Sequence, residues 1–136
     1  MISSNAKAGS LRKVIRKMGE PCISFYLKAH RIYVHFEALR AIGCPNRICF
    51  MISEKGDRLL MMPYGKRDLV SHKVPERLYE GTNGFDISSY KLCSLLAELH
   101  GWDLNKSYRI LGNVAPKYSI IIYDLTKVRI IDNGLK

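Results

Sequence analysis

The sequence lacks any apolar run close to the roughly 20 residues that a helix needs to cross a bilayer. Its longest apolar stretches, around residues 59–62 and 119–123, have the length of strands. The N-terminal segment also lacks the continuous apolar core of a secretory signal, because basic residues interrupt it. These two absences exclude a membrane-spanning helix and predict a cytoplasmic location.

The linear motifs of common enzymes are absent as well. There is no GxSxG, no Walker-type Gly-Lys-Ser/Thr loop and no GxGxxG, which are the usual signatures of hydrolases and of nucleotide and dinucleotide sites. The four histidines, His30, His35, His72 and His100, are scattered without the spacing of metal ligands. We therefore predict no catalytic residue, no metal site and no cofactor. A small nuclease built from scattered side chains, which leaves no linear motif, is the enzymatic alternative.

Cysteine is infrequent and unpaired in sequence. The four cysteines contain no CxxC pair and no spacing typical of a zinc finger; they stand at Cys22, Cys44, Cys49 and Cys93. A chain with 47% hydrophobic residues can build a core without disulfides. We predict four reduced thiols buried in one compact domain.

Acidic residues are scarce relative to basic ones. The 136 residues include 22 lysines and arginines against 12 acids, a formal net charge of +10. The excess is uneven, because residues 1–68 hold 13 basic and 5 acidic side chains and residues 69–136 hold 9 and 7. This charge favours nucleic acid, an anionic surface or an acidic protein as partner, contacted through the N-terminal half.

The first 20 residues differ from the rest. Residues 1–19 contain five basic residues and no acid, interspersed with serine and glycine. We predict a flexible basic arm over residues 1–20, which is either a solvated leader or a nucleic-acid-contacting arm. A single α+β domain over residues 21–136 follows it.

Two units of similar order are predicted within that domain. In unit one, residues 21–66, alternating apolar residues predict strands over 23–27 and 32–36, a short helix over 37–42 ended by Gly43, and a hairpin over 48–52 and 59–62. In unit two, residues 67–136, the same signals predict strands over 69–74 and 85–87, a helix over 90–100, a hairpin over 108–111 and 119–125, and an edge strand over 128–131. Since residue identities barely align, the repeat is one of structure.

The second helix is expected to bury a leucine stripe and to end beside the only tryptophan. The stripe comprises Leu92, Leu95, Leu96 and Leu99. Gly101 ends the helix, and Trp102 follows it. We expect Trp102 to plug the core at the helix end; an exposed anchor for a partner protein is the alternative.

Residues 31–63 carry an arginine-led strand, a short helix closed by Ile42-Gly43, and a hairpin. This order resembles the swapped-hairpin DNA-binding domain of AbrB/MraZ-type regulators and MazE-type antitoxins. Arg31 matches the arginine that opens the family's strand, and Glu37 and Arg40 match the acid and arginine of its helix. The chain departs from the family pattern at His30 and His35, where the family has glycine and proline, and at Leu27, where it has an acid.

The resemblance implies a double-layered barrel in which two such units interlock. The units come from two chains in most of the family and from one chain in MraZ-like proteins, and the family turns its arginines toward DNA. One unit alone would expose the inner faces of its strands, so we expect either unit two or a second copy to cover them, and favour a homodimer. The expected inner residues are Ile48, Phe50, Ile52, Leu60 and Met62.

Together these features predict a non-enzymatic DNA-binding regulator or DNA-associated accessory protein. The candidate DNA contacts are Lys28, Arg31, Arg40, Arg47, Lys66 and Arg67. Tyr26 and Tyr33, on the polar phase of their strands, either stack on bases or pack across strands. The alternative is a protein-interaction or antitoxin-like assembly module that does not read DNA.

Overall fold

The computed structural model describes residues 20–64, 71–76 and 83–131. The predicted N-terminal arm, apart from Glu20, and the candidate contacts Lys66 and Arg67 lie outside these residues. The first part of the chain forms β1 (Cys22–Tyr26), the 3-10 helix η1 (Leu27–Ala29), β2 (Arg31–Val34), α2 (Phe36–Ala41), β3 (Arg47–Ile52) and β4 (Arg58–Pro63). The second part forms β5 (Ser71–Lys73), β6 (Phe85–Ser88), α3 (Tyr90–His100), β7 (Ser107–Ala115), the 3-10 helix η3 (Pro116–Tyr118), β8 (Ile120–Asp124) and β9 (Arg129–Ile131). The predicted elements are therefore confirmed, most within one or two residues of their expected bounds.

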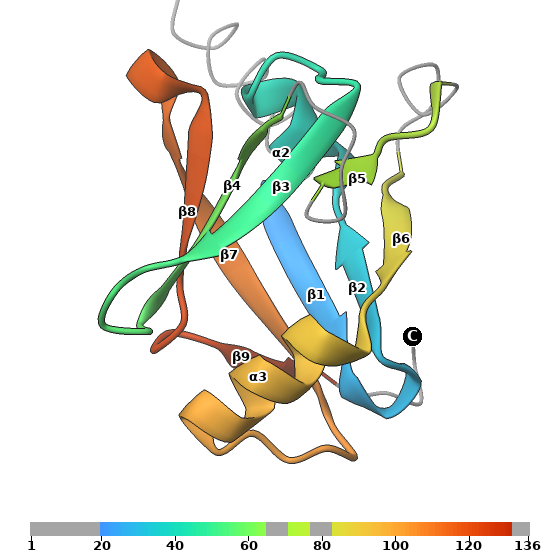
Figure 1. Cartoon of the computed structure of the whole chain (residues 1–136), viewed down its shortest axis with the longest axis vertical. Coiled ribbons are helices and arrows are strands. Elements are labelled where there is room, and N and C mark those ends of the chain that lie inside the picture. Colours follow the sequence, from blue (N-terminus) through green and yellow to red (C-terminus); the bar gives the residue numbers. More distant parts are fainter. Residues whose placement is uncertain (1–19, 65–70, 77–82, 132–136) are drawn as a thin grey trace, which may run out of the picture.

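The nine strands of the described residues join one antiparallel sheet that curls into a nearly closed barrel (Figure 1). The strand order is β5-β3-β4-β8-β7-β1-β2-β6, and β9 pairs with β7 beside β1. The helices α2 and α3 lie at opposite ends of the barrel (Figure 1). The α+β class and the barrel are thus confirmed. Of the helices in the described part, none combines the length and apolar character that spanning a membrane requires.

The repeat of elements is reflected in the sheet pairing. Each of β1 to β4 in unit one has a counterpart in β5 to β8 of unit two, in the same order. When every strand is exchanged for its counterpart, six of the seven neighbouring pairs in the strand order become pairs that the sheet contains; the pair β3–β4, for example, becomes β7–β8. The seventh, β1 with β2, becomes β5 with β6, which is the pair that would close the barrel. The two units therefore have equivalent places in one sheet, and each completes the other.

The inner surface of the barrel differs from the prediction in one strand. Ile48 of β3 is fully buried, and Phe50 and Ile52 pack against the core as expected. On β4, however, Leu59 and Met61 are fully buried, so the predicted inner residues Leu60 and Met62 are wrong. The register pairs Phe50 with Met61, and residues directly opposite in an antiparallel pair share a face. The turn between the strands sets this register. The cover for this surface comes from within the chain, and the homodimer stays a prediction.

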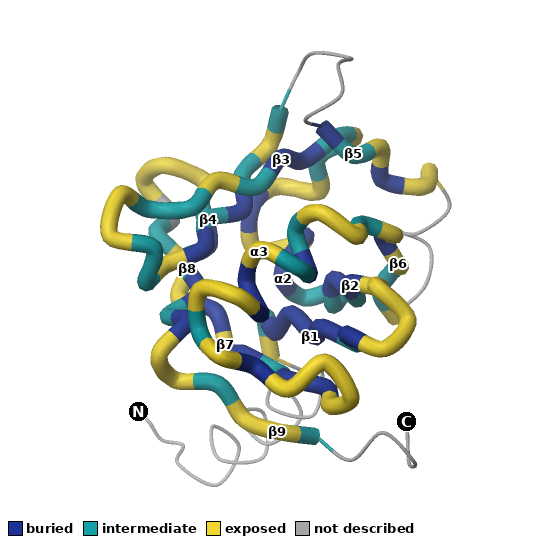
Figure 2. The backbone as a smooth tube through the Cα atoms, turned by 60° about the horizontal axis from the view of Figure 1, so that its bottom comes forward, coloured by how far each residue is buried: buried dark blue, intermediate teal, exposed yellow. Residues whose placement is uncertain are grey.

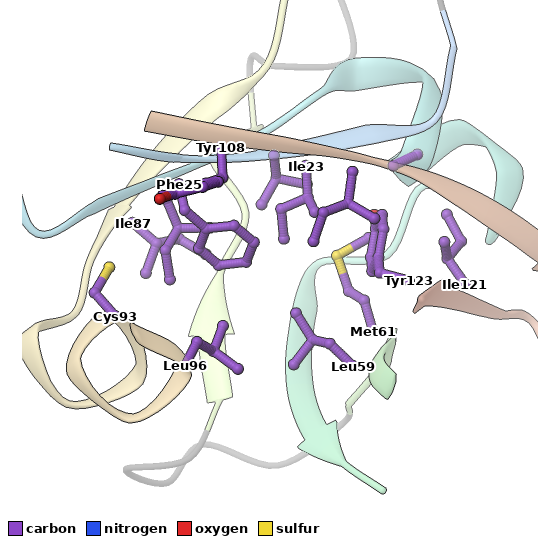
Figure 3. Packing of buried hydrophobic residues seen from close by; sticks show 14 of the residues in the cluster. Ile23, Phe25, Leu59, Met61, Ile87, Cys93, Leu96, Tyr108, Ile121 and Tyr123 are labelled. Carbon is purple, nitrogen blue, oxygen red and sulfur yellow. The ribbon is translucent and has the colours of Figure 1, made fainter. Parts of the chain in front are cut away.

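The second helix begins and ends where its sequence predicts. Ser89 caps its N-terminus by accepting a hydrogen bond from Leu92 N at 3.2 Å, and Gly101 ends it in a left-handed conformation with φ of 64°. The predicted leucine stripe is only partly correct, because Leu95 and Leu99 are 43% and 51% exposed. The side chains of Cys93 and Leu96 face the core (Figure 3). Ala97 is also buried, and Leu92 packs against the core from a partly exposed position. The helix lies across the barrel end with a narrower contact than a four-leucine stripe requires.

Trp102 is a core plug, as predicted. It is 9% exposed and stacks on Tyr108 with ring centroids 4.7 Å apart; its ring also lies 5.6 Å from that of Phe25. Next to it, His100 donates a hydrogen bond from Nε2 to Gly56 O at 2.8 Å, since a carbonyl can only accept. These contacts tie the C-terminal end of α3 to the turn between β3 and β4.

The cysteines are free thiols in two environments. Cys22, Cys49 and Cys93 are buried, and burial raises the pKa of Cys93 to about 11. Cys44 is exposed, so its predicted burial is wrong. It follows Gly43 in the turn after α2, where both residues have a positive φ and both are exposed. In the described ranges, no three histidine, cysteine or acidic side chains lie together as metal ligands.

Candidate nucleic-acid interface

One side of the barrel carries polar side chains in register across five strands. Ser24 of β1 lies opposite Tyr33 of β2 and Arg109 of β7. The same row continues to Asp86 on β6 and to Arg129 on β9. Ile23 and Phe25, the alternate residues of β1, belong to the hydrophobic core, so this row lies on the outer face, where neighbouring side chains cover Ser24.

A second outward row lies two residues further along the strands. Tyr26 of β1 is opposite Arg31 of β2 and Ser107 of β7. Ser88 of β6 extends it beyond Arg31. We call these two rows, together with Lys28 of η1, the polar face. The two rows hold three arginines and one acid, so the face is positive.

The polar face is hollowed beside η1. The hollow has a volume of about 430 Å³ and is open on its outer side. It is lined by Tyr26, Lys28, Ala29, Arg31, Tyr33, Asp86 and Ser107. The Arg31 guanidinium lies 5.8 Å from the centre of the Tyr26 ring, within the range of a cation–π contact. Aromatic rings, cations and a carboxylate therefore border the same space.

Arg109 is held in place by a buried hydrogen-bond chain. Its Nε donates to Ser24 Oγ at 2.9 Å, and Ser24 Oγ lies 3.0 Å from His35 Nε2. Since arginine can only donate, Ser24 Oγ accepts from Arg109, and its remaining lone pair and proton allow a second bond to His35 Nε2, in which the tautomer of His35 sets the donor. Ser24 has no exposed surface. This bond uses only the Nε–H of the guanidinium, and the four N–H groups on the two Nη atoms take no part in it.

His35 reflects this environment in its pKa. Burial, and then the charge of Arg109, lowers the pKa of His35 from 6.5 to about 4. The same causes act on His72, whose pKa is lowered by burial and by Arg47. His35 is the residue before α2, so its charge state bears on the junction between β2 and that helix.

Acidification is expected to destabilise the fold through His35. The unfolded chain binds the proton more tightly than the folded chain, so the free energy of unfolding should fall as the pH drops from about 6.5 to about 4. Because the imidazole is partly exposed, we expect a loss of about 1–2 kcal/mol. Urea unfolding at pH 7 and pH 5 measures it. His35→Gln should show a smaller difference than the wild type, and an equal difference would contradict the assignment.

Arg109 and Arg129 form the most positive part of the polar face. They are directly opposite each other in the pairing of β7 with β9. Both lower the pKa of Cys22, although its burial and the nearby Glu20 raise that pKa more strongly. Like charges directly opposite on neighbouring strands are destabilising. This pair therefore favours an anion beside it, and Glu20, which acts on the same Cys22 thiol, is one acid near it.

The other predicted contacts lie elsewhere. Arg47, at the start of β3, donates from Nε to Ser71 Oγ at 2.9 Å, a bond that matches Arg109 to Ser24 in the other unit. Arg40 lies at the end of α2, with its guanidinium 5.4 Å from the centre of the Phe36 ring. Both residues belong to the end of the barrel that carries α2, whereas Lys28 is in the turn at the α3 end (Figure 1). The structure thus places Lys28 and Arg31 together and the other two apart.

Sequence reasoning missed Arg109 and Arg129. The signal for Arg109 is present, because it stands between Tyr108 and Ile110, which are 5% and 1% exposed. The alternation shows that Arg109 points outward, but nothing in the local sequence shows that β7 neighbours β1. The polar face consequently draws on both halves of the chain, and not on the N-terminal half alone.

The side of the barrel formed by β3, β4 and β8 carries an apolar row. Outward positions of β3, β4 and β8 align Met51 with Leu60 and Leu60 with Ile122. Met51 is 55% exposed, and Leu60 and Ile122 are partly exposed. Figure 2 shows the exposed and partly buried backbone positions along these strands. Charged residues border this row in the same outward phase, because Arg58 is opposite Asp124 and Arg47 is opposite Lys73.

Comparisons with protein-family models, with curated proteins and with solved structures find no match.

Proposed function

We propose that this chain is a DNA-binding regulator or DNA-associated accessory protein that contacts nucleic acid through the polar face. The observation that carries the proposal is the register that puts Arg109 directly opposite Arg129 on the face that also holds Arg31. A bound phosphate relieves the repulsion between the two guanidinium groups. Phosphate neutralisation supplies most of the affinity of proteins for nucleic acid.

The face offers donors of the right kind for this role. Arginine presents a planar fork that can bind a phosphate or a guanine edge with two hydrogen bonds. The bond to Ser24 orients the Arg109 guanidinium before any ligand arrives, which reduces the entropy lost on binding. Tyr26 and Tyr33 line the hollow, and both residues are partly exposed. The sequence predicts that they either stack on bases or pack across strands.

We propose a binding role and not a catalytic one. Ser24 and His35 have the spacing of a nucleophile and its base, with 3.0 Å between Oγ and Nε2. Ser24 has no exposed surface, so a substrate atom cannot reach its hydroxyl. Its Oγ already forms hydrogen bonds with both Arg109 and His35. The pair fits a positioning role for Arg109.

The swapped-hairpin arrangement belongs to the same proposal. In a swapped-hairpin arrangement, the hairpin of each unit pairs with strands of the other unit, as in MraZ-type proteins with two units in one chain. The pairing of β1 with β7 and of β4 with β8 supports this view, because both pairs join strands of different units. The arginine-led strand of the resemblance then supplies Arg31 to the polar face.

A salt titration tests the proposed function. We expect the full chain to shift random duplex DNA or a single strand in a mobility assay at 50 mM salt. With about four phosphate contacts, affinity for duplex DNA should fall roughly 100-fold between 50 and 200 mM salt. Absence of binding at 50 mM salt, or an affinity that does not change with salt, would contradict the proposal.

The apolar row on the outside of β3, β4 and β8 favours a second candidate, self-association as an assembly module. Met51, Leu60 and Ile122 form a row without a charged side chain, and obligate interfaces are apolar in this way. Light scattering at micromolar concentration should then give twice the 15.6 kDa of one chain, and Met51→Lys should restore the monomer. A wild-type monomer would reject this candidate.

A further inference from the structure

We infer that the hollow beside η1 holds one unpaired nucleotide of a single strand and that guanine is the base it fits best. The inference rests on the proposed function and narrows its ligand. It is carried by the juxtaposition of two tyrosines, two cations and one carboxylate around a single space.

The size and walls of the hollow suit a nucleotide. Its volume of about 430 Å³ lies within the range of roughly 300–1,000 Å³ that is typical of small-molecule sites. Tyr26 and Tyr33 come from adjacent strands and are diagonal neighbours on the polar face. The Tyr33 hydroxyl accepts a hydrogen bond from Gly84 N, and its ring meets His35 edge-on at 4.9 Å. The ring is thereby fixed in place, as a stacking platform requires.

Four cations on the polar face can contact the phosphates of a bound single-stranded nucleic acid. Lys28 and Arg31 border the hollow and are both exposed. Arg109 and Arg129 lie across β1 from Arg31, on the same face. Neighbouring strands are about 4.8 Å apart, so the four cations cover a track of roughly 15 Å across β2, β1, β7 and β9. A strand with its base in the hollow can lay its adjoining phosphates along this track.

The carboxylate of Asp86 favours a ligand that donates hydrogen bonds, because an ionised carboxylate only accepts them. On a face that binds phosphates only, an acid weakens binding. Asp86 Oδ1 is 3.8 Å from Arg31 Nε, beyond hydrogen-bond length, and both side chains are about half exposed. Its oxygens therefore have room for further donors. Among the bases, guanine presents two adjacent donors, N1–H and the N2 amino group, which match the two oxygens of one carboxylate.

The same donors explain why the nucleotide must be unpaired. In a duplex, guanine N1–H and N2 are bonded to cytosine, and the faces of the base are covered by its neighbours. A sheet face with tyrosines reads bases that are splayed out of a helix, as sheet-based single-strand binders do. Thymine places a carbonyl on each side of its N3–H, so it repels the carboxylate on both sides.

The test compares two single strands on the full chain. One is a decamer of thymidines, and the other has a single central guanosine; fluorescence anisotropy at low salt measures both. We expect the guanosine strand to bind about tenfold more tightly. Asp86→Ala should remove this preference while it keeps or raises the affinity for the thymidine strand, because it removes a negative charge. Asp86→Asn tests the same point with the shape of the side chain retained, and Glu98→Ala, an exposed acid on α3, is the matched control.

Each other outcome is decisive. Equal affinities for the two strands, or a guanosine preference that survives in Asp86→Ala, would overturn the inference and leave the proposed function standing. Tighter binding of a duplex than of either strand would do the same. Failure of the wild type to bind any of the three nucleic acids at 50 mM salt would overturn the proposed function together with the inference.

Discussion

Replacing Lys28, Arg31 and Arg129 together with alanine is expected to weaken nucleic-acid binding on the order of 100-fold at low salt. Each side chain is exposed, and in our proposal each contacts a phosphate. The loss of three phosphate contacts should also reduce the slope of log K against log salt for a single strand by about 2. Mobility shifts over a salt series measure both quantities.

The control removes the same charge from other parts of the surface. Arg40, Lys55 and Lys117 are exposed and lie on α2, in the β3–β4 turn and in η3. Their triple alanine variant should lose only the small, general contribution of three positive charges. Equal losses in the two variants would show that net charge, and not the polar face, determines binding. Circular dichroism of both variants confirms that the sheet is retained.

Gly112→Ala is expected to lower the free energy of unfolding by about 3 kcal/mol, since overpacking that moves backbone is among the costlier core changes. Gly112 is buried where β7 leaves β1 and begins to pair with β8. A Cβ there would lie 2.7 Å from Pro21 O and 2.4 Å from a methyl carbon of Ile121. Gly112 N also donates to Pro21 O at 2.9 Å, so the strand cannot shift without losing that bond.

Thermal unfolding measures this effect, with an expected fall in Tm of about 10 °C. The neighbouring Asn113→Ala is the control, because Asn113 is exposed on the outer side of the same strand. It should change Tm by no more than a few degrees. If Gly112→Ala unfolds at the wild-type temperature, the close approach of the N-terminal end of β1 to β7 is not as described.

Local signals in the sequence predict the elements well. The second helix illustrates this, because Ser89 and Gly101 supply both of its caps within a few residues of its leucines. The period-2 alternation of residues 23–27 likewise predicts β1, since its apolar residues Ile23 and Phe25 alternate with Ser24 and Tyr26. Such signals act over distances of a few residues, which is the range that sequence patterns report.

Features set by long-range pairing could not be predicted. The residues of β4 that point into the barrel depend on its register with β3. The core therefore contains Leu59 and Met61, and not the expected Leu60 and Met62. The hydrogen bond from Arg109 to Ser24 joins residues 85 positions apart, and no local pattern in the sequence predicts it. The charge imbalance between the halves pointed to unit one alone, although the polar face combines strands of both units. The structure places the candidate contacts Lys28 and Arg31 beside one hollow, and their contact with DNA stays a prediction.

The most direct measurement maps the bound strand onto the chain by nuclear magnetic resonance. Backbone amide shifts of the full chain are recorded while the guanosine-containing decamer is added. We expect the largest shifts in η1, β2, β1, β7 and β9, with Tyr26, Arg31 and Arg109 among them. Shifts concentrated on β3, β4 and β8, or on α2 around Arg40, would contradict the assignment of the polar face as the nucleic-acid interface.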